Sequence, residues 1–130
     1  MNDFVKRLQD YDDFMSGKKG ATDSEIQEAE KELGLSFSKE YREYIGQLGI
    51  ATADGHEFTG IAEMPRLNVV HVTKSEKRKN SDIPENFYVI ERVGIDGIVI
   101  WQDQQGNIYE AINVGTAEKI AESLAEYLDA

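Results

Sequence analysis

Residues 22–49 constrain the fold more than any other stretch, because they contain the start and stop signals of two consecutive helices. Thr22 is a favourable N-cap residue, and Glu25 three positions later completes a capping box that satisfies two backbone donors. Gly34 can adopt the left-handed conformation that ends the first helix, and Ser38 can cap the second helix. Apolar residues recur at helical spacing in both segments, so we expect two short amphipathic helices that each bury one face. These faces consist of Ile26, Ala29 and Leu33 in the first helix and of Tyr41, Tyr44, Ile45 and Leu48 in the second.

Three further helices are predicted outside this pair. Helical periodicity extends over residues 2–16 and over residues 116–128. Residues 67–79 are ambiguous, because their valines favour a strand whereas Asn68 as an N-cap and the polar tail favour a helix. We expect the helix.

The strongest β signal lies in residues 87–112, where two glycine-containing turns separate three strands. These strands are expected at residues 87–92, 98–102 and 107–112. A fourth strand is expected at residues 56–61, after a turn signal at residues 53–55. The middle strand of the meander is apolar on both faces, so either both faces are covered or one stays open for contacts.

The elements predict one α+β domain over residues 1–130, with a single mostly antiparallel sheet of about four strands and helices packed around it. Their expected order is α-α-α-β-α-β-β-β-α. Cysteine is absent, which excludes disulfides, thiolate metal sites and a cysteine nucleophile. The acidic N-terminus is unlike a signal peptide, and no apolar run approaches the ~18 residues that span a bilayer. We therefore expect a soluble, cytoplasmic protein.

Charge is the most informative bulk property. The chain has 25 acidic and 14 basic residues, which gives a formal net charge of −11. Nucleic acids and anionic membranes would repel such a protein, so neither is expected as a partner, and a basic protein is favoured. Solubility alone is the alternative explanation of the charge.

Groups of residues with known catalytic patterns are scarce in this chain. His56 and His71 lie fifteen positions apart, and the sequence contains no phosphate-binding loop, nucleophile elbow or zinc-binding helix motif. We expect no enzyme activity, no cofactor and no metal. The basic cluster at residues 74–79 lacks interleaved aromatic residues and is best explained as a solvated helix end.

Acidic and aromatic side chains are the candidates for recognition of a partner. Several acids lie at expected turns or strand ends, where loops commonly present binding groups, and aromatic residues of the meander can anchor an interface. The predicted partner-binding residues are Asp54, Glu57, Asp96, Trp101, Asp103, Tyr109 and Glu110. Burial of Trp101 in the core is an equally good alternative for that residue.

Two adjacent motifs in the helix pair resemble the N-terminal signature of the SUKH superfamily. They are AEKELG at residues 29–34 and FSKEY at residues 37–41, and the later segment from residue 83 to residue 109 resembles the meander of the same superfamily. Ser38 stands where the superfamily usually has proline, and Leu48 stands where it often has asparagine. Within the signature, we expect the Glu30 side chain to bond a neighbouring backbone group.

The resemblance implies an α+β fold and, for most bacterial members, a role as an immunity protein. On this basis the expected partner is a cognate basic toxin domain, a nuclease or another nucleic-acid-directed toxin, which the chain would bind and neutralise as a monomer or weak homodimer. The alternative is a regulatory or interaction adaptor of the same fold that acts without a toxin.

Overall fold

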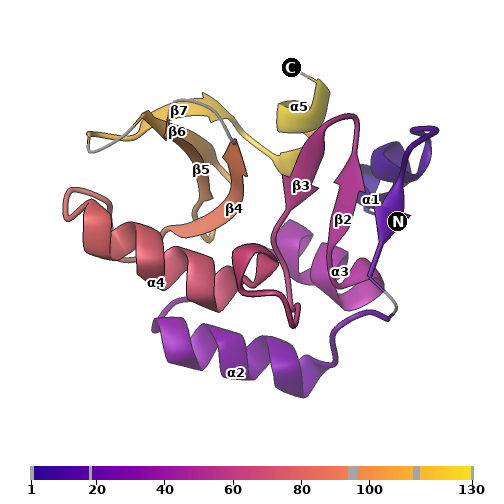
Figure 1. The fold of residues 1–130 in the computed structure, drawn as a ribbon, viewed down its shortest axis with the longest axis horizontal. Helices are drawn as coiled ribbons and strands as arrows, with labels where there is room; N and C mark the ends of the chain where they lie inside the picture. The colour runs from indigo at the N-terminus through magenta and orange to yellow at the C-terminus, as the bar shows by residue number, and fades with distance from the viewer. Residues whose placement is uncertain (1, 18, 94–96, 113–114, 130) are drawn as a thin grey trace.

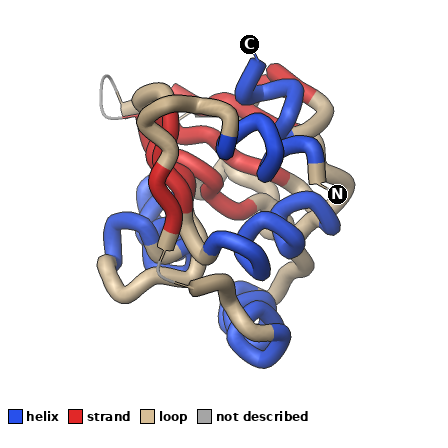
Figure 2. The backbone as a smooth tube through the Cα atoms, turned by 90° about the vertical axis from the view of Figure 1, so that its right-hand side faces the viewer, coloured by secondary structure: helices blue, strands red, loops and turns tan. Residues whose placement is uncertain are grey.

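The computed structural model describes residues 2–17, 19–93, 97–112 and 115–129. Within these residues the chain forms one antiparallel sheet of seven strands in the order β1-β2-β3-β4-β5-β6-β7, with five α-helices and one 3-10 helix, η1. Figure 1 and Figure 2 show the helices packed around this sheet, with α2 alongside α4. In chain order the elements are α1 (Asp3–Gln9), β1 (Met15–Ser16), α2 (Asp23–Leu33), α3 (Lys39–Leu48), β2 (Ala51–Ala53), β3 (His56–Phe58), η1 (Pro65–Leu67), α4 (Val69–Lys79), β4 (Tyr88–Val93), β5 (Ile98–Gln102), β6 (Ile108–Ile112), β7 (Glu118–Ala121) and α5 (Leu124–Asp129).

The α+β class and the antiparallel sheet are confirmed, but the expected number of about four strands is wrong. The part of the chain that the structure describes has seven, and the expected order α-α-α-β-α-β-β-β-α is therefore also wrong. The additional strands β1, β2 and β7 contain only two, three and four residues. Such short segments do not show enough alternation of inward and outward side chains to be recognised in a sequence.

The expected C-terminal helix over residues 116–128 divides into a strand and a short helix. Its first part, β7, pairs antiparallel with β6, so hydrogen bonding within the sheet overrides the helical spacing of its apolar residues. Ile120, expected in the buried face of that helix, is 42% exposed. The first helix is also shorter than expected and ends at Gln9, and Met15 instead pairs in the sheet.

The α2–α3 pair forms as the sequence predicts. Thr22 Oγ1 accepts from Glu25 N at 3.1 Å and Thr22 N donates to Glu25 Oε1 at 2.9 Å, which completes the capping box. Gly34 ends α2 in the left-handed conformation with φ of 66°. The predicted backbone contact of Glu30 is confirmed, since its carboxylate accepts from Phe37 N at 2.8 Å and fixes the connection between the two helices.

The ambiguous segment at residues 67–79 forms helix α4, as expected. Asn68 caps it, because its side-chain oxygen accepts from Val70 N at 3.0 Å and from His71 N at 3.2 Å. Val69, Val72 and Thr73 of α4 are buried. The cap decides the structure of these β-branched residues, which by themselves favour a strand.

The two faces of the central strand β5 are covered by different groups of side chains. Ile100 belongs to the main core, which contains residues of α1, α3 and α5. Val99 and Trp101 point to the opposite face and pack with Val72 of α4 in a smaller apolar cluster. Of the two alternatives for an apolar central strand, coverage on both sides is therefore the one observed.

A buried polar network joins the start of α3 to β4, β5 and α5. The Tyr88 hydroxyl accepts from Ser38 N at 2.9 Å and donates to Gln102 Oε1 at 2.7 Å, and the Ser38 hydroxyl donates to the same oxygen at 3.1 Å. Gln102 Nε2 donates to Glu40 Oε1 at 3.4 Å. Glu40 also accepts from Leu124 N at 2.7 Å, so one carboxylate links the first turn of α3 to the first turn of α5.

Replacement of Ser38 by alanine is expected to lower the free energy of unfolding by about 1–3 kcal/mol, because it removes the N-cap of α3 and a buried hydrogen bond. Urea denaturation followed by circular dichroism measures this change. Exposed Ser36 provides the control, and Ser36→Ala should change stability by less than about 0.5 kcal/mol. Equal effects of the two substitutions would contradict the role given to the network.

Candidate protein-binding site

Two of the predicted partner-binding residues, Asp54 and Glu57, line one pocket, and a third, Glu110, acts on it through its charge on Tyr127. Asp54 and Glu57 are exposed on the β2–β3 hairpin, and Glu110 is half-buried on β6. They lie with three residues that sequence analysis did not select. We call the six residues the acidic site: Asp54, His56, Glu57, Glu91, Glu110 and Tyr127.

Glu91 holds the acidic site together. This carboxylate is 3% exposed and accepts from His56 Nδ1 at 2.9 Å, from Glu57 N at 3.0 Å and from the Tyr127 hydroxyl at 2.5 Å. A buried charge is stable only when such partners replace its hydration. Because its oxygens are occupied by these donors, Glu91 positions the hairpin and α5 and leaves contact with a partner to its neighbours.

The pKa values in the site respond to this carboxylate. The hydrogen bond to Glu91 raises the pKa of His56 against the opposing effect of its own burial, and the charges of Glu91 and Asp54 raise it further. Burial and the charges of Glu91 and Glu110 raise the pKa of Tyr127, which therefore stays neutral and donates its proton to Glu91. When His56 is protonated, it is the counter-charge of the buried carboxylate.

Three glutamates lie in one row of paired residues that crosses the sheet from strand to strand. Directly paired positions on neighbouring strands point to the same face, and the row runs Phe58–Glu91–Ile100–Glu110–Glu118 from β3 to β7. Glu110 and Glu118 are direct neighbours in this row. Two like charges in that position repel each other and lower the stability of the domain. A role in recognition would explain why both glutamates are present.

The β2–β3 turn presents the exposed acids. Asp54 and Gly55 have positive φ values of 51° and 81°, as the two central residues of a type I′ hairpin require. Asp54 N donates to both carboxylate oxygens of Asp13 at 3.0 and 3.1 Å, which fixes the turn against the loop before β1. Glu57 forms an exposed ion pair with Arg66 at 3.0 Å.

The other predicted contact residues lie apart from the acidic site. Trp101 is 1% exposed on the opposite face of the sheet, beside α4. Asp103 is buried in the β5–β6 turn, where it accepts from the Tyr109 hydroxyl at 2.9 Å and from Asn107 N at 3.0 Å. Asp96 lies outside the described residues. Partner contacts by these residues stay predictions, and Trp101 can make them only through the cavity beside it.

The structure provides no grouping for metal binding in the acidic site. Within residues 2–17, 19–93, 97–112 and 115–129, no three His, Asp or Glu side chains converge as metal ligands. No helix in the same residues is long and apolar enough to cross a membrane.

The SUKH family model SUKH_5, described as SMI1-KNR4 cell-wall, matches residues 1–130. The chain belongs to the SUKH superfamily. The match confirms the resemblance carried by residues 29–34 and 37–41. SUKH proteins are immunity or cell-wall-related proteins and are generally not enzymes. None of the curated proteins matches this chain.

The stability of this SUKH domain should depend on pH through His56. A raised pKa in the folded state means that protonated His56 stabilises the fold below about pH 6.5, its ordinary pKa, and that this contribution is lost as the pH rises through the raised value. His56→Gln should therefore reduce stability by roughly 1 kcal/mol at acidic pH and by less at alkaline pH. Urea denaturation at several pH values measures the difference, and His71→Gln, at an exposed position of α4, controls for loss of an imidazole. A constant difference across the pH range would contradict the His56–Glu91 pairing.

Removal of the exposed member of the like-charge pair should stabilise the domain. Glu118→Gln is expected to raise the free energy of unfolding by roughly 0.2–1 kcal/mol, because it ends the repulsion from Glu110. The control is Glu122→Gln, which removes an exposed acid that lies 3.4 Å from Lys119 Nζ and should give no such gain. Urea denaturation measures the free energy of unfolding of both variants. An equal increase in both would show that the effect comes from net charge and not from the pairing of Glu110 with Glu118.

Proposed function

We propose that this SUKH protein is an immunity protein that binds and neutralises a cognate basic toxin domain, a nuclease or another nucleic-acid-directed toxin, in the cytoplasm. The observation that carries the proposal is the acidic site, in which buried Glu91 holds the backbone of exposed Glu57 and Asp13 holds the backbone of exposed Asp54. A surface with fixed acids is preorganised for cationic side chains and loses little freedom when they bind. The protein would act as a monomer or weak homodimer.

Charge supports this choice of partner. The net charge of −11 attracts a basic domain over a distance and raises its association rate, most strongly at low salt. Toxins that act on nucleic acids need a basic cleft for their substrate, so an acidic inhibitor can compete for that cleft. The two carboxylates on the hairpin provide the contact points.

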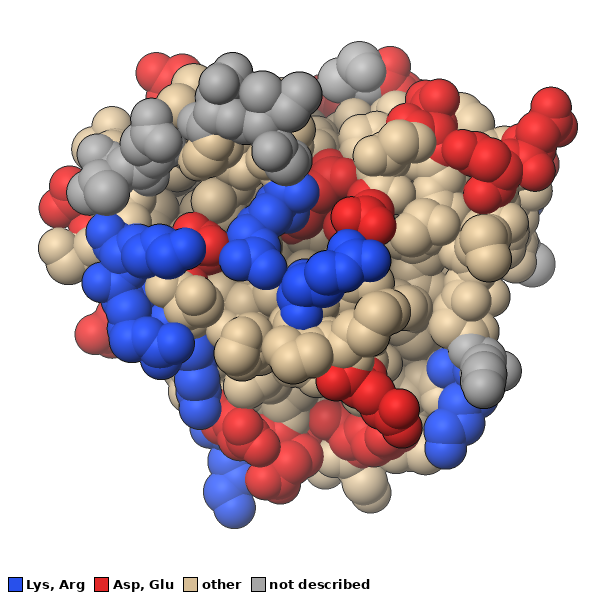
Figure 3. Space-filling model, viewed as in Figure 1, with Lys and Arg blue, Asp and Glu red and all other residues tan. Residues whose placement is uncertain are grey.

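The surface is not uniformly acidic, which limits where the partner can bind. Figure 3 shows Lys and Arg side chains gathered on the face that includes α4, with Asp and Glu side chains among and around them. Helix α4 carries the basic residues Lys74, Lys77, Arg78 and Lys79, and Arg92 of β4 lines the same cavity as Lys79. A basic toxin would be repelled there, so the proposed contact is confined to the hairpin, β6 and β7.

A regulatory adaptor that acts without a toxin is the second candidate. The family description, SMI1-KNR4 cell-wall, favours it, because it names a cell-wall connection and no toxin. A pull-down from the native cell distinguishes the two, since an immunity protein should capture a toxin domain encoded beside its own gene.

The decisive variant removes both exposed hairpin charges. Asp54→Asn combined with Glu57→Gln should slow association with the neighbouring toxin domain roughly 3- to 10-fold at low salt, because local steering is lost. The same variant should also weaken protection of cells that express the toxin. Stopped-flow or surface-based kinetics at several salt concentrations measure the association rate.

The matched control carries the same two types of substitution at Asp82 and Glu85, which are exposed in the loop between α4 and β4. Asp82→Asn with Glu85→Gln changes the net charge equally and should leave the association rate within about twofold of the parent. An equal fall in the association rate of both variants would show that net charge, and not the acidic site, determines the rate. Failure of the folded parent protein to bind or protect would overturn the toxin as partner.

A further inference from the structure

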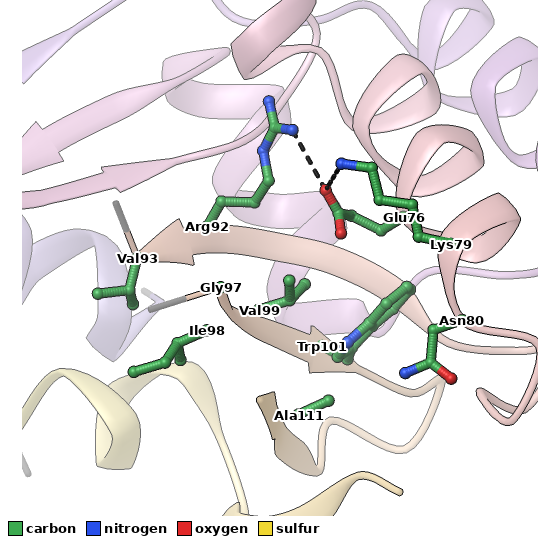
Figure 4. Close-up of a pocket in the computed structure, with 10 residues that line it drawn as sticks. All are labelled: Glu76, Lys79, Asn80, Arg92, Val93, Gly97, Ile98, Val99, Trp101 and Ala111. Carbon is green, nitrogen blue, oxygen red and sulfur yellow. Dashed lines mark hydrogen bonds and ion pairs between the residues drawn. The ribbon is translucent and has the colours of Figure 1, made fainter. Parts of the chain in front are cut away.

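A cavity of about 460 Å³ lies on the face of the sheet opposite the main core, between the end of α4 and strands β4 to β6. Its walls include the apolar side chains of Val99, Trp101 and Ala111, and its charged residues are Glu76, Lys79 and Arg92 (Figure 4). The volume lies within the range of small-molecule sites, which combine apolar walls with a few polar groups. None of the six residues of the acidic site lines this cavity, although Arg92 and Val93, which follow Glu91 on β4, border both.

The indole N–H of Trp101 is a hydrogen-bond donor beside this cavity. Trp101 is 1% exposed, and Nε1 has no hydrogen-bond partner among the residues that the structure describes. Figure 4 shows the nitrogen-bearing edge of the ring turned toward Val99 and Ala111, away from Asn80. Buried indole N–H groups normally have an acceptor, so an unpaired one beside a cavity calls for an acceptor from outside the chain.

The charges of the cavity specify what kind of acceptor fits. Glu76 is 3.2 Å from Arg92 Nη1 and 3.5 Å from Lys79 Nζ, so one carboxylate faces two cations and one positive charge remains. Within the described residues only Nη1 of Arg92 has a partner, which leaves Nε and Nη2 as donors. A planar guanidinium with two such groups suits the two oxygens of a carboxylate.

We propose that this cavity binds a small monocarboxylate with an apolar body, whose carboxylate pairs with Arg92 and whose oxygen accepts from Trp101 Nε1 while its apolar part lies on Val99 and Ala111. Lys79 of α4 and Arg92 of β4 line the cavity, so an anion is attracted locally although the whole protein is acidic. The site does not depend on toxin binding, because it lies on the basic face and the proposed toxin contact lies on the hairpin, β6 and β7.

The single tryptophan of the chain is itself the probe for the test. Titration of the full chain with hexanoate at millimolar concentrations should change Trp101 fluorescence in a saturable way and shift the one indole N–H signal in a ¹H–¹⁵N spectrum. Hexanamide, which keeps the apolar body and lacks the charge, should bind at least about tenfold more weakly. Absence of a saturable response, equal affinity for hexanoate and hexanamide, or an unmoved indole signal would each overturn the proposal.

A pair of arginine variants separates specific pairing from the general field of the basic face. Arg92→Gln should weaken hexanoate binding at least about tenfold, whereas Arg78→Gln on the same face should change it less than about threefold. Arg92 is partly exposed, and circular dichroism checks that the variant stays folded. Equal effects of the two substitutions would show that hexanoate responds only to the surface charge, and would refute the assigned contact.

Discussion

The hydrogen-bonded network of Ser38, Glu40, Tyr88 and Gln102 determines how the helices sit on the sheet. Gln102 receives two hydroxyl donors through one oxygen and gives its amide protons to Glu40 and to the Gly106 carbonyl at 3.1 Å. Burial raises the pKa of Glu40, and the backbone N–H groups at the start of α5 oppose this effect. A half-buried carboxylate with these donors is favourable where it is, whereas any loss of register between α3 and α5 would leave it without partners.

The acidic site depends on the same network through α5. Glu40 fixes the first turn of α5, and Tyr127 in that helix then reaches Glu91 on β4. His56 on β3 bonds the same carboxylate, and its ring packs against that of Tyr127. The position of the Glu40 carboxylate at the start of α3 therefore affects the contacts of the Glu91 carboxylate in the sheet. This connection ties the short, exposed elements of the acidic site to the core of the domain.

Local signals made the helical part of the fold predictable, and non-local pairing made the rest unpredictable. The cap of α2 and its left-handed glycine lie within one helix, so the sequence contains the whole interaction. By contrast, the apolar residues of β7 have helical spacing, and the segment forms a strand because it pairs with β6. Sequence analysis did not select Glu91 for a related reason. A bulge between Val89 and Glu91 shifts the alternation of β4, so regular alternation would have assigned Glu91 to the wrong face.

The same bulge gives the two faces of the sheet opposite charges. Glu91 pairs with Ile100 and points to the acidic site, while the next residue, Arg92, pairs with Val99 and points to the cavity beside α4. Two consecutive side chains of opposite charge thus have their partners in two adjoining pockets. A change of one residue in the register of β4 would place Arg92 against His56 and Tyr127, and would place a carboxylate beside Glu76. The irregularity in this strand therefore keeps Glu91 beside His56 and Arg92 beside Glu76, so that each charge faces a suitable neighbour.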